Sequence, residues 1–128
     1  MSYYFTKTLD MPFDTAIIHV TEALAAKGFG VLTTIDVKAT MKKKLDVDFK
    51  PYTILGACNP RLALSALQAE DKIGTMLPCN VIVTESAPGT VEVAAVDPVA
   101  SMSAIQNPSL GETAAKVRQM LSDVIDSL

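Results

Sequence analysis

The stretch that decides the fold is CNVIVTESAPGTVEVAAVD, at residues 79–97. It contains two runs rich in valine, Cys79–Glu85 and Val91–Asp97, and β-branched residues of this kind favour strands. The residues between them, Ser-Ala-Pro-Gly-Thr at 86–90, are turn formers, so the stretch predicts a β-hairpin with a longer loop. Because a hairpin pairs its strands antiparallel, at least part of the sheet must be antiparallel.

Upstream of the hairpin, residues with strand-forming side chains predict three more strands, at Tyr3–Leu9, Phe29–Val37 and Tyr52–Cys58. A helix is predicted between the first two, because apolar residues from Phe13 to Leu24 recur at helical spacing until Gly28 ends the pattern. These elements are separated by no linker or repeat, so we expect one domain over residues 1–128.

Two short helices and one long helix complete the predicted order. Residues 38–45 form a short helix with lysines in solvent, and Asn59-Pro60 supplies an N-cap and a first-turn proline for a second short helix. The last helix is predicted to start at an S-x-x-E capping box, Ser109 to Glu112, and to run to Leu128. The order β-α-β-(short α)-β-(short α)-β-β-α is that of an α+β protein.

Composition excludes several classes of function. The chain has 128 residues, of which 49 % are hydrophobic, so it can bury a real core and is not disordered. Its net charge of −3 argues against a nucleic-acid partner, and the three lysines at 42–44 have no interleaved aromatic residue. The sequence shows neither an apolar run of membrane-spanning length nor a secretory signal, so we expect a cytoplasmic protein without a membrane partner. The G-x-G at 28–30 precedes a strand rather than a helix, which excludes a nucleotide-binding crossover.

The chemistry of the sequence centres on two cysteines, Cys58 in GACNP (56–60) and Cys79 in LPCN (77–80). If Asn59 caps the helix that follows, the Cys58 sulfur lies at a helix N-terminus and Arg61 adds a cation nearby. Both effects favour the thiolate and lower the thiol pKa. The alternative is that Cys58 is a small buried hydrophobe at an ordinary strand-to-helix turn. Cys79 shares a strand face with valines and is more simply explained by core packing.

Taken as a pair, Cys58 and Cys79 could form a reversible disulfide, relay a persulfide or supply two ligands of a soft-metal site. Their spacing matches neither C-x-x-C nor a zinc ribbon, so a structural zinc would need ligands from a second copy. The asparagine after each cysteine, Asn59 and Asn80, is a candidate for holding a bound group by hydrogen bonds.

Three blocks of the sequence carry a family resemblance: GFGVLTTIDVKATMKKKL at 28–45, YTILGACNPRLALSAL at 52–67 and IGTMLPCNVIV at 73–83. They resemble the signature blocks of the bacterial and archaeal domain-of-unknown-function family number 302. The resemblance implies a TATA-binding-protein-like topology, in which helices pack on a curved, mainly antiparallel sheet, and a homodimer. It implies neither a reaction nor a cofactor.

The sequence therefore supports three hypotheses of function. The first is a small homodimeric module that binds a small ligand or performs thiol redox or sulfur-transfer chemistry. Cys58 would then be the nucleophile, Cys79 the resolving partner and Arg61 a stabilising cation. The second is a non-enzymatic structural or interaction module in which both cysteines are core residues. The third is soft-metal binding by Cys58 and Cys79.

Overall fold

The computed structural model describes residues 2–128, and its strands form a five-stranded antiparallel sheet in the order β1-β5-β4-β3-β2. The strands are β1 (Tyr4–Asp10), β2 (Gly30–Asp36), β3 (Tyr52–Cys58), β4 (Cys79–Ala87) and β5 (Thr90–Val96). The predicted hairpin, β4–β5, lies inside the sheet between β1 and β3. The expected five-residue loop is wrong, because the strands continue to Ala87 and Thr90 with a register irregularity after Glu85.

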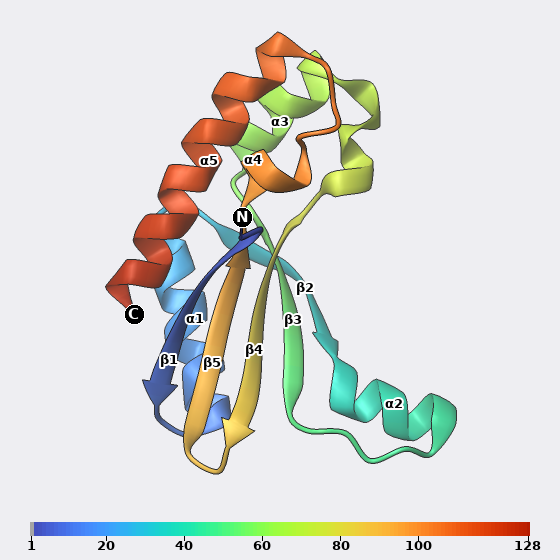
Figure 1. Cartoon of the computed structure of the whole chain (residues 1–128), viewed down its shortest axis with the longest axis vertical. Coiled ribbons are helices and arrows are strands. Elements are labelled where there is room, and N and C mark those ends of the chain that lie inside the picture. The colour runs from blue at the N-terminus through green and yellow to red at the C-terminus, as the bar shows by residue number, and fades with distance from the viewer. Residues whose placement is uncertain (1) are drawn as a thin grey trace.

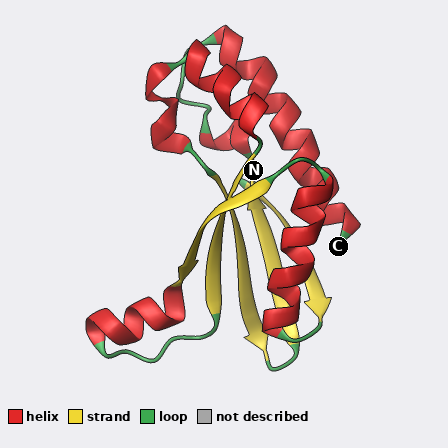
Figure 2. Ribbon diagram, turned by 180° about the vertical axis from the view of Figure 1, so that it is seen from behind, coloured by secondary structure: helices red, strands yellow, loops and turns green. Residues whose placement is uncertain are grey.

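Helices cover one face and one end of the sheet (Figures 1 and 2). They are α1 (Phe13–Ala26), α2 (Val37–Leu45), α3 (Pro60–Ala69), the 3₁₀ helix η1 (Asp71–Met76), α4 (Pro98–Ser101) and α5 (Pro108–Ser127). The helices α1 and α5 pack on the same face, whereas α3, η1 and α4 gather at one end. At the opposite end, α2 projects away from the sheet. The predicted α+β class is confirmed.

The main core fills the space between the sheet and the helices α1 and α5. Alternate residues of each strand point into it, as the two-residue period of a strand requires. Its fully buried members include Val20, Leu24, Leu55, Val81, Val83, Val91, Val93, Leu121 and Val124. A second cluster, made of Ala66, Ile73, Met102, Leu110 and Ala114, joins α3, η1, α4 and α5. This second cluster fixes the end of the sheet at which both cysteines lie.

An Asn or Asp followed by proline begins three of these helices. At α3 the prediction is confirmed, because the Asn59 side chain accepts a hydrogen bond from the Leu62 amide at 3.3 Å. At α5 the predicted capping box is wrong. The N-cap lies two residues earlier: the helix begins at Pro108, and Asn107 accepts from the Ser109 amide at 3.1 Å. The third case, Asp97-Pro98, starts α4, which the sequence analysis did not predict.

The helix α2 is unusual because none of its residues is buried. Its N-cap is Asp36, which accepts from the Ala39 amide at 2.9 Å. Lys42 lies 2.9 Å from Asp46 and 3.4 Å from Asp48, and all three side chains are exposed. Such exposed pairs contribute little to stability, so neither sequence propensity nor ion pairs explain why this helix projects from the sheet.

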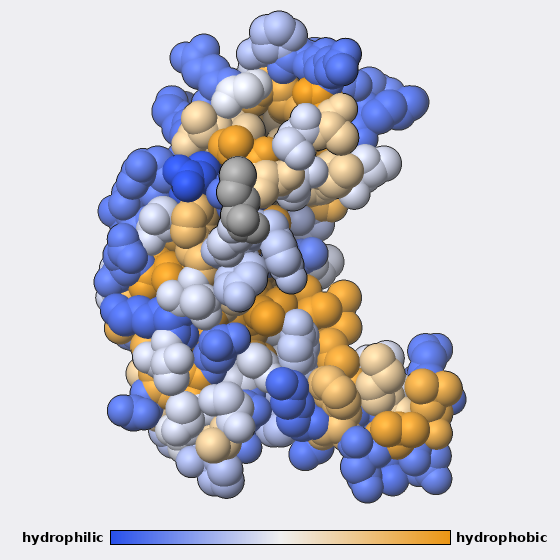
Figure 3. Space-filling view, viewed as in Figure 1, coloured by the Kyte–Doolittle hydropathy of each residue, from blue (hydrophilic) through white to orange (hydrophobic). Residues whose placement is uncertain are grey.

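The second face of the sheet carries no helix, within residues 2–128 (Figures 1 and 2). Strand pairing places one residue from each strand in a row across this face: Thr6, Ala94, Ile82, Ile54 and Ile35. The row ends at the edge strand β2, where Leu32 and Ile35 are exposed. Hydrophobic side chains accordingly gather along the middle of this face and on the projecting α2 segment (Figure 3).

In the part of the chain that the structure describes, no helix combines the length and the apolar character needed to cross a bilayer.

Candidate functional site

The strand-to-helix turn from β3 to α3 holds Cys58 half-buried at its edge. The cap by Asn59 fixes the turn, and the amide nitrogen Nδ2 of Asn59 lies close over Gly28. A Cβ atom added to Gly28 would be 3.1 Å from that nitrogen, and the φ angle of Gly28 is +84°. Gly28 thus leaves room for the asparagine and adopts a backbone conformation that favours glycine. The predicted position of Cys58, directly before the first turn of a helix, is confirmed.

Cys79 begins β4, and its strand partner is Ala57, the residue before Cys58. The two cysteines therefore lie at the same end of neighbouring strands. Cys79 is only 7 % exposed. Burial, and to a lesser extent the neighbouring Cys58, together raise the pKa of the Cys79 thiol from 9.0 to about 11. At neutral pH Cys79 is a protonated thiol.

A glycine brings the LPCN segment close to β3. A Cβ atom on Gly56 would lie 2.7 Å from the ring carbon Cγ of Pro78 and would also meet the Thr33 side chain. Only the absence of a side chain at residue 56 lets Pro78 pack against the strand. The GACNP and LPCN segments therefore pack directly against each other, although more than a dozen residues separate them in the sequence.

Both cysteines line one small cavity between the sheet end and the helices α3, α4 and α5. Its volume is about 40 Å³, enough for one small group but not for a molecule the size of a common metabolite. Apart from Asn59 and Thr113, its walls are apolar or sulfur-bearing and include Phe29, Ala57, Leu62, Ala66, Pro98, Met102, Leu110 and Val117. A polar group entering this cavity would find as partners chiefly the two sulfur atoms and these two polar side chains.

The other candidate residues lie elsewhere. Arg61, on the first turn of α3, is exposed and is not among the residues that line the cavity. Asn80 is exposed on the uncovered face of the sheet, because successive strand residues point to opposite faces. The structure therefore brings together Cys58, Cys79 and Asn59, but neither Arg61 nor Asn80.

Residues 2–128 contain no group of three or more histidine, cysteine, aspartate or glutamate side chains placed to hold a metal ion. One copy would therefore supply at most two thiolate ligands, and a four-coordinate zinc would need further ligands of another kind or from outside the chain.

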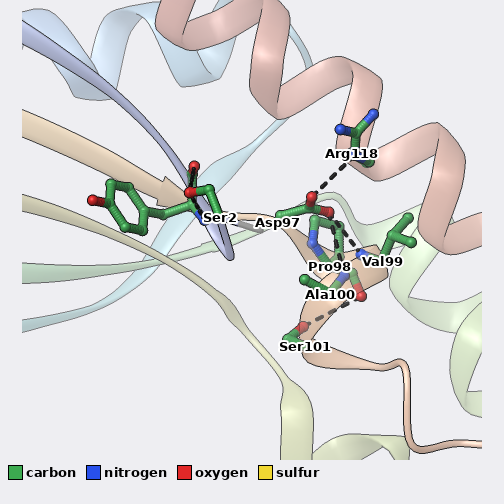
Figure 4. Close-up of polar contacts among 8 residues, drawn as sticks. Ser2, Asp97, Pro98, Val99, Ala100, Ser101 and Arg118 are labelled. Carbon is green, nitrogen blue, oxygen red and sulfur yellow. Dashed lines mark hydrogen bonds and ion pairs between the residues drawn. The ribbon is translucent and has the colours of Figure 1, made fainter.

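The structure contains one buried polar cluster that the sequence analysis missed (Figure 4). Asp97, 7 % exposed, accepts hydrogen bonds from the Val99 and Ala100 amides and from Nε of Arg118 at 3.0 Å. The Arg118 guanidinium also lies 5.3 Å from the ring centroid of Phe5. This cluster ties β1, β5, α4 and α5 together behind the thiol cavity. The Asp-Pro dipeptide at 97–98 was its one signal in the sequence.

A second missed feature is a larger cavity, of about 390 Å³, on the uncovered face. All three tyrosines of the chain, Tyr3, Tyr4 and Tyr52, line it together with Glu92 and Asn80. Sequence spacing gave no signal for this site, because only the strand order 1-5-4-3 brings residues 3–4 and 52 to the same face.

Comparisons with known proteins identify the family but not a reaction. No curated protein matches the sequence. A crystal structure of an uncharacterized conserved protein DUF302 from Bacillus stearothermophilus is similar, with a TM-score of 0.90 and 28 % sequence identity over 98 % of each chain. The model of the family described as Domain of unknown function DUF302 matches residues 5–128. This match covers nearly the whole sequence, which shows that the chain belongs to that family.

Proposed function

We propose that Cys58 is the nucleophile of a sulfur-transfer site and carries a single sulfur atom as a persulfide in the cavity beside it. The observation that carries this proposal is the pairing of a half-buried thiol with a fully buried one around a cavity of about 40 Å³. A cavity of that size accommodates one added sulfur atom. The positive end of the α3 helix dipole favours an anion, which a persulfide is at neutral pH.

The protonation of Cys79 favours sulfur transfer over disulfide exchange. A resolving cysteine must attack as a thiolate, and with a pKa of about 11 only about one Cys79 in ten thousand is ionised at pH 7. A Cys58 persulfide is therefore protected from attack by its neighbour. The neutral Cys79 thiol can donate a weak S–H hydrogen bond to the bound sulfur.

The proposed reaction balances without an oxidant. The Cys58 thiolate attacks the outer sulfur of a donor persulfide, the donor S–S bond breaks, and the donor leaves as its thiolate. An acceptor thiolate then attacks the outer sulfur of the Cys58 persulfide, and the Cys58 thiolate leaves. Each step exchanges one S–S bond for another. A cytoplasmic location, as expected from the sequence, would keep both thiols reduced for this cycle.

The test uses reduced, metal-free protein incubated with a low-molecular-weight persulfide and analysed by intact mass and peptide mapping. We expect a gain of one sulfur atom at Cys58 in the wild type and in Cys79→Ser, and none in Cys58→Ser. An added acceptor thiol should remove that sulfur.

Other outcomes contradict the proposal and identify an alternative. Loss of two hydrogens from the wild type alone indicates a Cys58–Cys79 disulfide and thiol redox chemistry. Copper or zinc that copurifies with the protein and is lost in either variant indicates soft-metal binding. If neither cysteine gains sulfur before the protein unfolds, the cysteines are core residues and the module is non-enzymatic.

We also propose that the chain is a homodimer, joined through the β2 edge and the segment 36–51. In this segment Leu45, Val47 and Phe49 are 41–66 % exposed, and on β2 Leu32 is 68 % exposed. Segment 36–51 carries five lysines and three aspartates, a net charge of +2, and because the whole chain carries −3, the remainder carries −5. A second copy offers both apolar surface that can cover these exposed side chains and acidic surface that complements the positive charge of the segment.

Sedimentation of the wild type and two matched variants tests the dimer. Leu32→Lys should shift the protein toward monomer. Ile18→Lys, which places the same charge at an apolar residue that is 61 % exposed on α1, should not. A wild type that sediments as a monomer at all concentrations would overturn the proposal.

A further inference from the structure

The uncovered face of the sheet has a cavity that is lined by three tyrosines and, among the described residues 2–128, by a single charged side chain, a carboxylate. The cavity, of about 390 Å³, is lined by Tyr3, Tyr4, Tyr52, Asn80, Ile82, Glu92, Ala94, Ala95 and Val96. Its volume is in the range of small-molecule sites. The rings of Tyr3 and Tyr4 meet edge to face, with centroids 5.0 Å apart, and form one wall.

Glu92 lies in the same strand row as Tyr52, whereas Tyr4 lies opposite Val96, four residues further along β5. Strand pairing joins Glu92 to Thr84 and Thr84 to Tyr52. Glu92 is half-buried, and within residues 2–128 its carboxylate makes no ion pair and no side-chain hydrogen bond. No lysine or arginine lines the cavity. Among residues 2–128, the site therefore presents a carboxylate without a cationic side-chain partner in a cavity lined by three tyrosines.

We propose that this cavity binds an organic ammonium group. A tetrahedral ammonium centre with an apolar body is attracted to the faces of tyrosine rings and to a nearby carboxylate. Its alkyl part would cover the apolar floor made by Ile82, Ala94 and Val96. A small inorganic cation of the same charge would lose its hydration without gaining these apolar contacts. This inference does not depend on the thiol chemistry at the other side of the sheet.

Two sources could supply the ammonium group: a free amine, or a lysine on segment 36–51 of a second copy. The second source would connect the cavity with the proposed dimer. Both have the same chemistry, so both require Glu92.

The chain offers a direct probe of this cavity. It has three tyrosines and no tryptophan, and all three tyrosines line the cavity, so intrinsic fluorescence reports on this site alone. The experiment titrates the protein with tetramethylammonium chloride and, at matched ionic strength, with sodium chloride. We expect a saturable change with tetramethylammonium and none with sodium.

Two isosteric variants complete the test. Glu92→Gln should weaken tetramethylammonium binding by about tenfold or more. The control is Glu85→Gln, which removes the same charge from the neighbouring strand. Glu85 pairs with the core residue Val91 and so belongs to the opposite face, and this variant should bind like the wild type. Absence of a saturable change with tetramethylammonium, combined with fluorescence that is independent of protein concentration, would overturn the proposal. Equal binding by both variants would also overturn it.

Protein concentration distinguishes the two sources. If a lysine of a second copy fills the cavity, dilution alone changes the fluorescence, and tetramethylammonium and Glu92→Gln each shift sedimentation toward monomer. If the ligand is a free amine, the fluorescence responds to tetramethylammonium without a change in sedimentation.

Discussion

Raising the pH from 9 to 11 should destabilise this protein through one residue, Cys79. Its thiol is 7 % exposed, and the folded protein raises its pKa from 9.0 to about 11. Because the folded pKa is higher than the unfolded one, the folded state keeps its proton at a pH where the unfolded state has lost it. The resulting stabilisation is fully present below pH 9 and is lost as the pH rises through 11.

The size of the effect follows from the pKa shift. Each pKa unit corresponds to about 1.4 kcal/mol, so the shift at Cys79 is worth about 3 kcal/mol. Part of it comes from Cys58, whose ionisation makes a second nearby thiolate more costly. In a Cys58→Ala background the loss of stability should therefore occur at lower pH and be smaller.

Urea denaturation of the wild type and Cys79→Ala, from pH 8 to 11, isolates this contribution. All other ionisable groups are common to both proteins, so their contributions to the pH dependence of stability cancel in the difference. We expect the free energy of unfolding of the wild type, relative to Cys79→Ala, to fall by about 2 kcal/mol over this range, with the rest of the stabilisation lost above pH 11. Parallel pH profiles would refute the reasoning, because they would mean that the Cys79 thiol ionises equally in both states.

Three further predictions concern packing and capping around the same end of the sheet, and urea denaturation checks each. Gly56→Ala should destabilise by about 1–3 kcal/mol, because its Cβ would lie 2.7 Å from a proline ring carbon. Gly30→Ala, with nothing within 4 Å of the new Cβ, should change stability by less than about 1 kcal/mol, and equal effects would refute the contact. Asn59→Ala should lower the free energy of unfolding by about 1 kcal/mol, and Asn59→Asp should lower it much less, because aspartate also caps helices. Equal losses in the two variants would exclude the capping role of Asn59. Asp97→Ala should lower the free energy of unfolding by about 2 kcal/mol, because it removes both the cap of α4 and a half-exposed ion pair. Arg118→Met removes the ion pair alone and should lower it by about 1 kcal/mol. The reverse order would contradict the capping role of Asp97.

Local sequence patterns predicted the elements whose structure depends on residues that are close together in the sequence. The α1 stripe, the β4–β5 hairpin and the Asn59 cap each depend on residues close together in the sequence, and each is confirmed. The same reasoning failed at Ser109, where a capping-box pattern competed with the Asn-Pro start two residues earlier. Proline suits the first helical position because an amide at that position has no acceptor within the helix, so the N–H group that proline lacks is not missed.

The sites that depend on strand order were only partly predictable. The sequence identified Cys58 and Cys79 as a pair of interest, and the antiparallel pairing of β3 with β4 brings them to one cavity. The tyrosine cavity could not be found in this way, because nothing in the local sequence of Tyr52 indicates that it shares a face with Tyr3 and Tyr4. The strand order, with β1 beside β5 and three strands from β3, brings all three tyrosines to one cavity.

The repeated Cys-Asn dipeptide has two different physical roles. At Cys58-Asn59 the chain turns into a helix, so the asparagine caps α3 and stays beside the thiol cavity. At Cys79-Asn80 the chain enters a strand, where successive side chains point to opposite faces. Cys79 then lines the thiol cavity and Asn80 the tyrosine cavity, and both also border a third cavity of about 240 Å³. The first residues of β4 thus contribute to both proposed sites. Asn80→Ala should therefore alter ammonium binding and leave sulfur transfer to Cys58 unchanged, as peptide mapping and tyrosine fluorescence on the same sample would show.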